Sequence, residues 1–251
     1  MLPIVLIHGF PFDSGMWREQ AAFLRGKGHT VVTPDLPGFG GTPPLPRERT
    51  SMEAFAGVVH EEIAKVGRKA IVGGLSMGGY VLLALLRDYP ESVAAAMLID
   101  TRADADSAEA QANRLKSIEE IEKNGPGKVV EGMMGKLFGK QPTEAVKGEV
   151  KGMMERQKAG VGGGGWEGMA NALWGMAKRR DQTDLLPELR VPVLIVVGAE
   201  DGITPPSVAL KMQSLMPQGM VVQIAGAGHM SPMEQPAAVN RAIETFLATV
   251  K

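Results

Sequence analysis

The sequence contains no cysteine and only four histidines among its 251 residues. The absence of cysteine excludes disulfide bonds, thiolate nucleophiles and cysteine-ligated metal sites. Positive and negative side chains nearly cancel, with 27 Lys and Arg against 28 Asp and Glu, so the net charge is -1. A chain with this balance is not expected to bind nucleic acid or an acidic membrane surface, and a neutral small molecule fits better as its partner.

Long apolar runs are also missing from the sequence. No stretch approaches the roughly 20 apolar residues that a membrane-spanning helix needs. Residues 4–7 form an apolar run directly after Met1-Leu2-Pro3, without the basic segment and small-residue cleavage site of a signal peptide. We therefore expect a cytoplasmic protein.

Hydrophobic residues make up 44% of the chain, which is enough to bury a sizeable core. A capping box at Thr50 and Glu53 predicts the start of a helix that runs to about Val66. Strands that alternate with helices at this spacing predict a parallel sheet covered on both faces, with ligands at the carboxyl ends of the strands. The strands are predicted at residues 3–8, 30–33, 69–74, 93–99, 191–198 and 219–224.

The segment between the fourth and fifth predicted strands has a different texture. It contains charged and Met-rich helical patterns interrupted by glycine, and no convincing strand. We therefore expect residues 106–185 to form a helical cap on a single core domain that comprises residues 1–105 and 186–251. The four glycines at 162–165 fit either a hinge of this cap or an exposed loop.

A glycine-flanked serine, Ser76, follows an apolar strand and precedes a helical pattern within residues 71–80. A serine hydroxyl is a poor nucleophile near neutral pH, so this placement is useful only if a base and an oxyanion site converge on it. His229 follows the last predicted strand, and no other histidine is placed in this way. Asp201 follows the preceding strand, which gives the chain order Ser, Asp, His.

These three side chains would form a catalytic triad. His229 would remove the proton of Ser76 during attack and return it to the leaving group, while Asp201 holds the imidazole tautomer. The backbone N–H groups of Phe10 and Met77, at the carboxyl ends of two strands, are the candidate oxyanion hole. This scheme needs no metal and no cofactor.

Five motifs occur in the chain in this order: His8-Gly9-Phe10, Asp35-Leu36-Pro37-Gly38-Phe39-Gly40, Gly74-Leu75-Ser76-Met77-Gly78-Gly79, Gly198-Ala199-Glu200-Asp201 and Gly228-His229. With these motifs in this order, the chain resembles the α/β-hydrolase superfamily, specifically its small, single-chain serine esterases and lactonases. The resemblance covers residues 1–105 and 186–251, whereas the expected cap matches only in position. It implies a six-stranded, mostly parallel sheet and hydrolysis of small, largely apolar carboxylic esters or lactones through an acyl-enzyme on Ser76.

The resemblance also leaves other reactions open. A similar triad serves perhydrolysis of carboxylic acids with peroxide and cleavage of a carbon–carbon bond in a diketone. A ligand receptor that keeps the triad but turns over negligibly is a further alternative. Dehalogenases and epoxide hydrolases of this fold have Asp in place of Ser76, and plant hydroxynitrile lyases have Lys in place of Met230, so these classes are disfavoured.

Three other polar residues lie close to the proposed site. Asp100 directly follows the strand at 93–99 and is the alternative acid, because some hydrolases of this fold take their acid from that strand. The family spacing Gly-x-x-Asp favours Asp201. We expect His8 to fix loop backbone through hydrogen bonds, and Glu200 to face solvent or a neighbouring backbone.

The substrate pocket is expected to use large apolar side chains. A methionine-rich helical face that contains Met169, Leu173 and Met176 is either plain core packing or part of an adaptable acyl pocket. The sequence leaves the oligomeric state open between monomer and homodimer. The side chains predicted to contact substrate are Phe12, Phe138, Trp166 and Trp174.

Overall fold

A six-stranded sheet forms the centre of the computed structural model, which describes residues 1–159, 166–216 and 218–250. The strand order is β2-β1-β3-β4-β5-β6, and every neighbouring pair is parallel. The predicted fold class and six-stranded sheet are therefore confirmed. The strands are β1 (Ile4–Ile7), β2 (Val31–Val32), β3 (Ala70–Leu75), β4 (Val93–Ile99), β5 (Val193–Gly198) and β6 (Gly219–Ile224).

The central strands are buried on both faces, which explains their continuous apolar sequences. Strands β1, β3 and β5 are buried along their whole length. The edge strands differ, because β2 has only two residues and β6 is half-exposed over most of its length. The candidate site residues follow the carboxyl ends of these parallel strands, including the edge strand β6.

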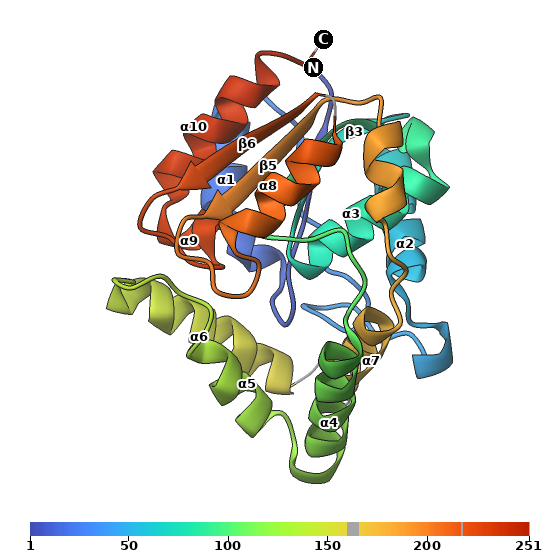
Figure 1. Ribbon diagram of the computed structural model, residues 1–251, viewed down its shortest axis with the longest axis vertical. Coiled ribbons are helices and arrows are strands. Elements are labelled where there is room, and N and C mark those ends of the chain that lie inside the picture. The colour runs from blue at the N-terminus through green and yellow to red at the C-terminus, as the bar shows by residue number, and fades with distance from the viewer. Residues whose placement is uncertain (160–165, 217, 251) are drawn as a thin grey trace.

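Helices cover both faces of the sheet (Figure 1). Helices α1 (Arg18–Gly26) and α10 (Pro236–Leu247) pack against each other on one face, and α2 (Met52–Val66), α3 (Met77–Asp88) and α8 (Pro206–Leu215) cover the other. Short helical turns complete the core, namely α9 (Ser231–Glu234) and the 3-10 helices η1 (Ser14–Trp17), η2 (Arg47–Arg49), η3 (Pro90–Ser92) and η4 (Thr183–Glu188).

The start of α2 differs from the prediction by one residue. The N-cap is Ser51, whose hydroxyl accepts a hydrogen bond from the Ala54 amide at 3.1 Å. The capping box predicted at Thr50 is therefore wrong. The buried Thr50 hydroxyl instead donates to the backbone carbonyls of Leu45 and Pro46, at 3.3 and 3.0 Å, and so stabilises the preceding loop.

Four helices follow β4, namely α4 (Ala108–Asn124), α5 (Gly127–Met134), α6 (Glu144–Ala159) and α7 (Glu167–Ala177). They lie at the end of the molecule opposite the two termini (Figure 1), and the described part of this segment contains no strand. The glycines at 162–165 lie outside the described residues. The treatment of residues 106–185 as a separate cap stays a prediction. Across the described ranges, no helix is both long and apolar enough to cross a membrane.

Candidate active site

Ser76 lies in a sharp turn between β3 and α3, where its φ of 52° and ψ of -111° are unusual for a residue with a side chain. Such a conformation costs about 1–3 kcal/mol and persists only where its surroundings enforce it. Here the Ser76 amide donates to the Ile99 carbonyl at 2.9 Å, and the Ser76 carbonyl accepts from the Thr101 hydroxyl at 2.8 Å. These bonds hold the half-buried serine at the carboxyl end of β3.

The glycines on either side of Ser76 are required by close backbone packing. A Cβ atom on Gly74 would lie 2.2 Å from the carbonyl oxygen of Gly78, and one on Gly78 would lie 2.3 Å from that of Ile7. Real Cβ atoms do not approach other atoms so closely, so α3 can begin against β1 and β3 only with glycine at these positions.

His229 and Asp201 form a buried pair, in which His229 Nδ1 lies 2.8 Å from Asp201 Oδ2. The carboxylate also accepts hydrogen bonds from the amides of Ile203 and Thr204, at 2.7 and 2.9 Å, and from the Thr204 hydroxyl at 2.7 Å. The sequence reasoning missed Thr204, although the spacing Asp-x-x-Thr suggests an aspartate that caps its own turn. These contacts fix the carboxylate that holds the histidine.

The surroundings of the Asp201–His229 pair favour an ionised Asp201 carboxylate. Burial opposes ionisation of Asp201, but its hydrogen bonds to His229 and Thr204 lower its pKa below the ordinary value. Burial alone would lower the pKa of His229, and the Asp201 carboxylate outweighs it and raises that pKa. In the neutral histidine, Nδ1 therefore keeps its proton against Asp201, and Nε2 is the nitrogen able to accept a proton.

The strand order places Ser76, Asp201 and His229 at one edge of the sheet, because they follow the carboxyl ends of the parallel strands β3, β5 and β6. The Ser76 hydroxyl makes no hydrogen bond to a described residue, so its contact with His229 is not formed in this structure. Catalytic hydrogen bonds often tighten only when substrate binds. The geometry supports the triad, which stays a prediction.

The candidate oxyanion hole consists of two backbone amides that have no acceptor among the described residues. These amides belong to Phe10 and Met77, which are both buried. The register of β1 against β3 pairs Ile7 with Gly74 and so brings the two following loops together. Buried N–H groups without an acceptor are rare, and a pair beside a candidate nucleophile is suited to binding an oxyanion.

Asp100, the alternative acid, hydrogen-bonds other groups. Its Oδ1 accepts from the Gly198 amide at 2.7 Å, and its Oδ2 accepts from the Ser231 hydroxyl at 2.5 Å. Its complete burial raises its pKa to about 7, partly offset by the positive charge that His229 can carry. Of the two candidate acids, Asp201 is the one that hydrogen-bonds the histidine.

The predicted structural roles of His8 and Glu200 are confirmed. His8 Nε2 accepts a hydrogen bond from the Leu36 amide at 3.0 Å, so its Nδ1 donates to the Gly9 carbonyl at 2.9 Å. Burial lowers the pKa of His8, consistent with a neutral ring. Glu200 accepts a hydrogen bond from the backbone amide of Lys140 at 2.5 Å.

Glu234 connects the histidine loop to the segment between α5 and α6. Its two carboxylate oxygens accept hydrogen bonds from the amides of Gly228 and Gly139, each at 2.8 Å. The two backbones pack so closely that a Cβ atom on Gly228 would lie 2.3 Å from the carbonyl carbon of Phe138. The sequence offers no signal for this contact, which positions the loop that carries His229.

Comparison with known proteins identifies the family. The chain matches the family described as "Alpha/beta hydrolase family" over residues 4–242. The chain belongs to the alpha/beta hydrolase family. The resemblance to the α/β-hydrolase superfamily drawn from the motifs is therefore confirmed.

Similar members of the alpha/beta hydrolase family differ in their described activities. The solved structure of a thermophilic esterase from Thermogutta terrifontis, with malate bound, is 39% identical, with a TM-score of 0.91 and coverage of 100% of this chain and 90% of that one. A putative non-heme bromoperoxidase from Mycobacterium tuberculosis is 28% identical, over 99% of this chain and 95% of its own length. A 2-hydroxy-6-oxononadienedioate/2-hydroxy-6-oxononatrienedioate hydrolase from Pseudomonas is 25% identical, over 98% and 87%.

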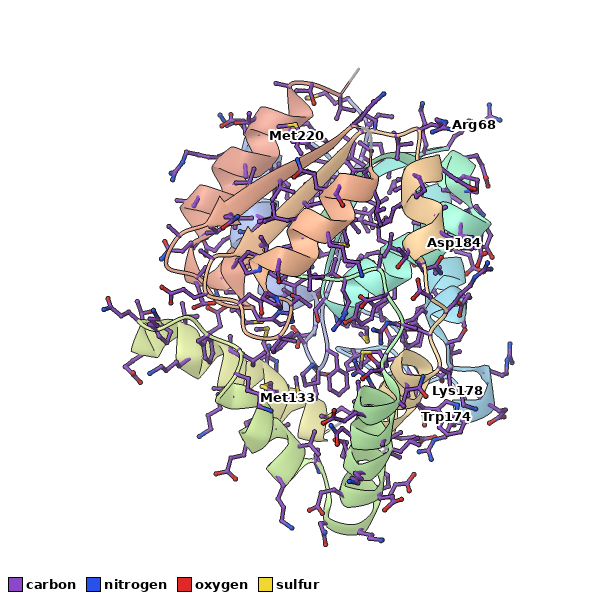
Figure 2. All side chains as sticks on the ribbon, in the orientation of Figure 1. Arg68, Met133, Trp174, Lys178, Asp184 and Met220 are labelled. Carbon is purple, nitrogen blue, oxygen red and sulfur yellow. The ribbon has the colours of Figure 1, made fainter. Side chains whose placement is uncertain are left out.

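The candidate substrate cavity of this alpha/beta hydrolase has a volume of about 620 Å³ and lies between α4, α5, α7 and the core. It reaches Phe10, which carries a candidate oxyanion amide, and Ile203, whose amide binds Asp201. Met133 of α5 is among its apolar lining residues (Figure 2). Neither Ser76 nor the histidine is part of the lining, so the cavity adjoins the triad through these two loops.

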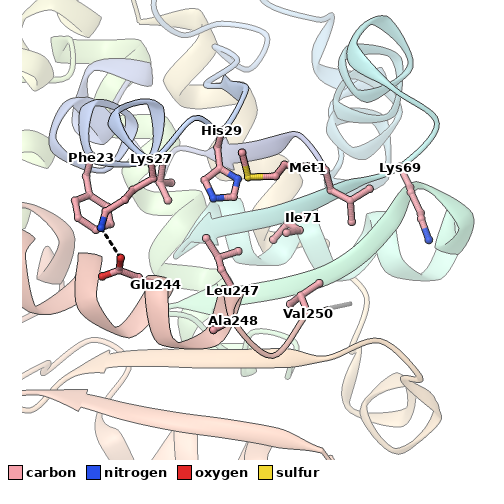
Figure 3. Close-up of a pocket in the computed structure, with 12 residues that line it drawn as sticks. Met1, Phe23, Lys27, His29, Lys69, Ile71, Glu244, Leu247, Ala248 and Val250 are labelled. Carbon is pink, nitrogen blue, oxygen red and sulfur yellow. Dashed lines mark ion pairs between the residues drawn. The ribbon is translucent and has the colours of Figure 1, made fainter.

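A larger cavity, of about 780 Å³, lies at the opposite edge of the sheet (Figure 3). Its lining residues include Met1, Lys69 and Val250 (Figure 3), which precede β1, precede β3 and follow α10, respectively. Because Ser76 follows the other end of β3, this cavity is separated from the candidate triad by the length of the strand. It has no part in the proposed chemistry.

The side chains predicted to contact substrate do not line the cavity beside the triad. Phe12 is fully buried, and Phe138 is half-buried against the core. Trp166 is 39% exposed, and Trp174 of α7 lies beneath Lys178, whose Nζ is 3.7 Å from the ring centre (Figure 2). Contact of these four side chains with substrate stays a prediction.

The methionine-rich face of α7 was predicted to be either core packing or part of an acyl pocket. Met169 and Met176 are 0% and 2% exposed and belong to the hydrophobic core. Leu173, on the same face, lines the 620 Å³ cavity. Leu173 is also buried in the core, at 4% exposed, so core packing accounts for all three side chains, and Leu173 is the one that also borders the cavity.

Proposed function

We propose that this alpha/beta hydrolase is a serine hydrolase that cleaves small, largely apolar carboxylic esters or lactones through an acyl-enzyme on Ser76. The observation that carries the proposal is the buried Asp201–His229 hydrogen bond, located at the same sheet edge as the strained serine. The full-length similarity to the Thermogutta terrifontis esterase supports the same reaction class.

In the proposed reaction, Nε2 of His229 removes the Ser76 proton as Oγ attacks the carbonyl carbon. The negative oxygen of the tetrahedral intermediate accepts hydrogen bonds from the amides of Phe10 and Met77, and the positive end of the α3 dipole favours the same charge. Collapse breaks the ester bond, and the histidine gives its proton to the departing alkoxide.

Deacylation repeats these steps with water as the nucleophile. His229 removes a proton from water, which attacks the acyl-enzyme, and the proton then returns to Ser76 as the carboxylic acid leaves. Asp201 stays ionised throughout and stabilises the imidazolium formed in each half-reaction. The products of an ester are one acid and one alcohol.

Replacement of the nucleophile tests the proposal. Ser76→Ala should lower kcat for p-nitrophenyl butyrate by at least about 10³-fold, because no acyl-enzyme can form. Circular dichroism should show an unchanged fold. Ser214→Ala, which changes an exposed hydroxyl that bonds only the Lys211 carbonyl, is the matched control and should keep full activity. Undiminished turnover by Ser76→Ala would remove the hypothesis.

Perhydrolysis and carbon–carbon bond hydrolysis by the same triad stay as alternatives, because two relatives are described with activities other than ester hydrolysis. The bromoperoxidase relative is a reason to offer peroxide as the nucleophile, and the Pseudomonas relative is a reason to offer a substrate with a scissile carbon–carbon bond. Product analysis separates these reactions, since perhydrolysis yields a peracid. A burst without steady-state turnover would instead favour a ligand receptor.

A further inference from the structure

The charges of α4, α5 and the two residues that follow α5 are distributed unevenly around the 620 Å³ cavity. Residues 108–136 contain five Lys and Arg and five Glu, so this segment is neutral as a whole. Four of the five cations line the cavity, whereas only one of the five carboxylates does. The remaining four carboxylates lie outside the lining. The cavity-lining residues from this segment are Asn113, Arg114, Lys116, Ser117, Glu120, Lys128, Val129, Gly132, Met133 and Lys136.

Two of the four cations already have partners. Arg114 is paired with Asp106 at 2.5 Å, and Lys128 is paired with the single lining carboxylate at 2.9 Å. Lys116 and Lys136 are exposed, and neither ammonium group has an ion-pair or hydrogen-bond partner within the described ranges. The cavity is therefore bordered by two positive charges that no carboxylate of the described chain neutralises.

The other side of the cavity is apolar and belongs to the candidate reaction centre. Phe10 and Ile203 come from the core, and Leu173 comes from α7. Phe10 also carries a candidate oxyanion amide. A ligand whose ester group reaches that amide would place its apolar chain against this wall, and its far end would lie toward Lys116 of α4 and Lys136, which follows α5.

We propose that the preferred substrates carry an anionic group, a carboxylate at the end of the acyl chain remote from the scissile bond, and that Lys116 and Lys136 select it. This inference rests on the proposed esterase function. It narrows the substrate class to esters that are apolar near the reacting carbon and negatively charged at the far end. Because both ammonium groups are exposed, selection acts through electrostatic attraction that salt screens.

The test compares two series of methyl esters of graded chain length. One series consists of half-esters of α,ω-dicarboxylic acids, and the other replaces the free carboxylate with a neutral carboxamide of nearly the same shape. The readout is the ratio of kcat/KM for the two esters of equal length, which cancels effects on the chemical step. The wild-type protein should favour the half-ester by about tenfold at low ionic strength, and added NaCl should reduce this preference.

Variants at the two lysines identify the source of the preference. The double change Lys116→Glu and Lys136→Glu should lower the ratio by at least about tenfold, whereas Lys116→Arg with Lys136→Arg should keep it. Lys69→Glu is the matched control, because it makes the same charge change on an exposed lysine at the opposite edge of the sheet (Figure 3). This control should leave the ratio unchanged.

A ratio near one in the wild-type protein at low ionic strength would overturn the inference, and so would a ratio unaffected by the two glutamates. Turnover of p-nitrophenyl butyrate distinguishes this failure from failure of the proposed function. If Ser76-dependent turnover of that ester persists while the ratio is near one, only the charge selection is wrong. If no ester is hydrolysed, the esterase proposal itself has failed.

Discussion

At the scale of single residues, the pKa values of two buried aspartates near the site are shifted in opposite directions by their surroundings. Asp201 accepts hydrogen bonds from two amides, one hydroxyl and the His229 ring, and these lower its pKa. Asp100 accepts only one amide and one hydroxyl, and burial raises its pKa to about 7. Burial therefore dominates the pKa of Asp100, whereas hydrogen bonds and the neighbouring His229 dominate that of Asp201.

The roles of the two aspartates can be separated by matched substitutions. Asp201→Asn should lower kcat by about 10³–10⁴-fold, because an amide does not hold the histidine in the required tautomer. Asp100→Asn should keep most of the activity, since Asn can still bond Gly198 and Ser231. Asn also tolerates the positive φ of 43° at this position. Steady-state kinetics with p-nitrophenyl butyrate measure both effects.

The pH profile distinguishes this role from loss of the fold. His229 acts as a base only when neutral, so the wild-type rate should fall as pH drops through its pKa, which is raised above the ordinary 6.5. Without the Asp201 charge that pKa falls, so the acid limb of the residual Asp201→Asn activity should move to lower pH. If Asp100→Asn is instead the inactive variant, the acid has been misassigned.

At the scale of secondary-structure elements, the histidine loop and the α5–α6 connection behave as one unit. Glu234 accepts a hydrogen bond from one backbone amide of each segment. Gly228 precedes it by six residues in the sequence, and Gly139 precedes it by 95. Because the loop following β6 carries His229, a shift of this contact would move the base. The contact makes the position of the histidine depend on the helical segment.

Replacement of Glu234 tests this dependence. Glu234→Gln should lower the free energy of unfolding by about 1–3 kcal/mol, because an amide group can accept through only one atom and leaves one N–H without a partner. It should also reduce kcat by roughly tenfold through misplacement of His229. Denaturant unfolding and steady-state kinetics provide the two readouts.

Glu61→Gln, an exposed change on α2, is the matched control and should alter neither quantity. Loss of stability in Glu234→Gln with unchanged kcat would show that the contact does not position the base. Loss of neither would show that the two hydrogen bonds contribute nothing measurable.

The fold and the candidate site could be predicted from the sequence where a single short stretch contains the pattern that identifies the feature. Apolar strands identified the sheet, and the glycine-flanked serine within residues 71–80 identified the strand-to-helix turn at Ser76. The start of α2 was misplaced because Thr50 and Ser51 are adjacent and both suit an N-cap. The Glu234 contact could not be predicted, because it joins segments whose proximity depends on how the helices pack.

At the scale of the whole molecule, a net charge of -1 conceals an uneven distribution. The balance of charges favours a neutral partner, but most cations of residues 108–136 line the cavity, while most carboxylates of that segment lie elsewhere. This separation depends on how the two helices face the core, so composition cannot report it. A cytoplasmic location, a lack of nucleic-acid partners and a monomeric or homodimeric state stay predictions.

The most direct test of the central claim is to locate the covalent adduct left by a fluorophosphonate probe. The account predicts one adduct per chain, mapped by peptide mass spectrometry to Ser76, with labelling lost in Ser76→Ala and slowed in His229→Ala. An adduct on another residue, or ester hydrolysis that continues after complete labelling of Ser76, would contradict the account.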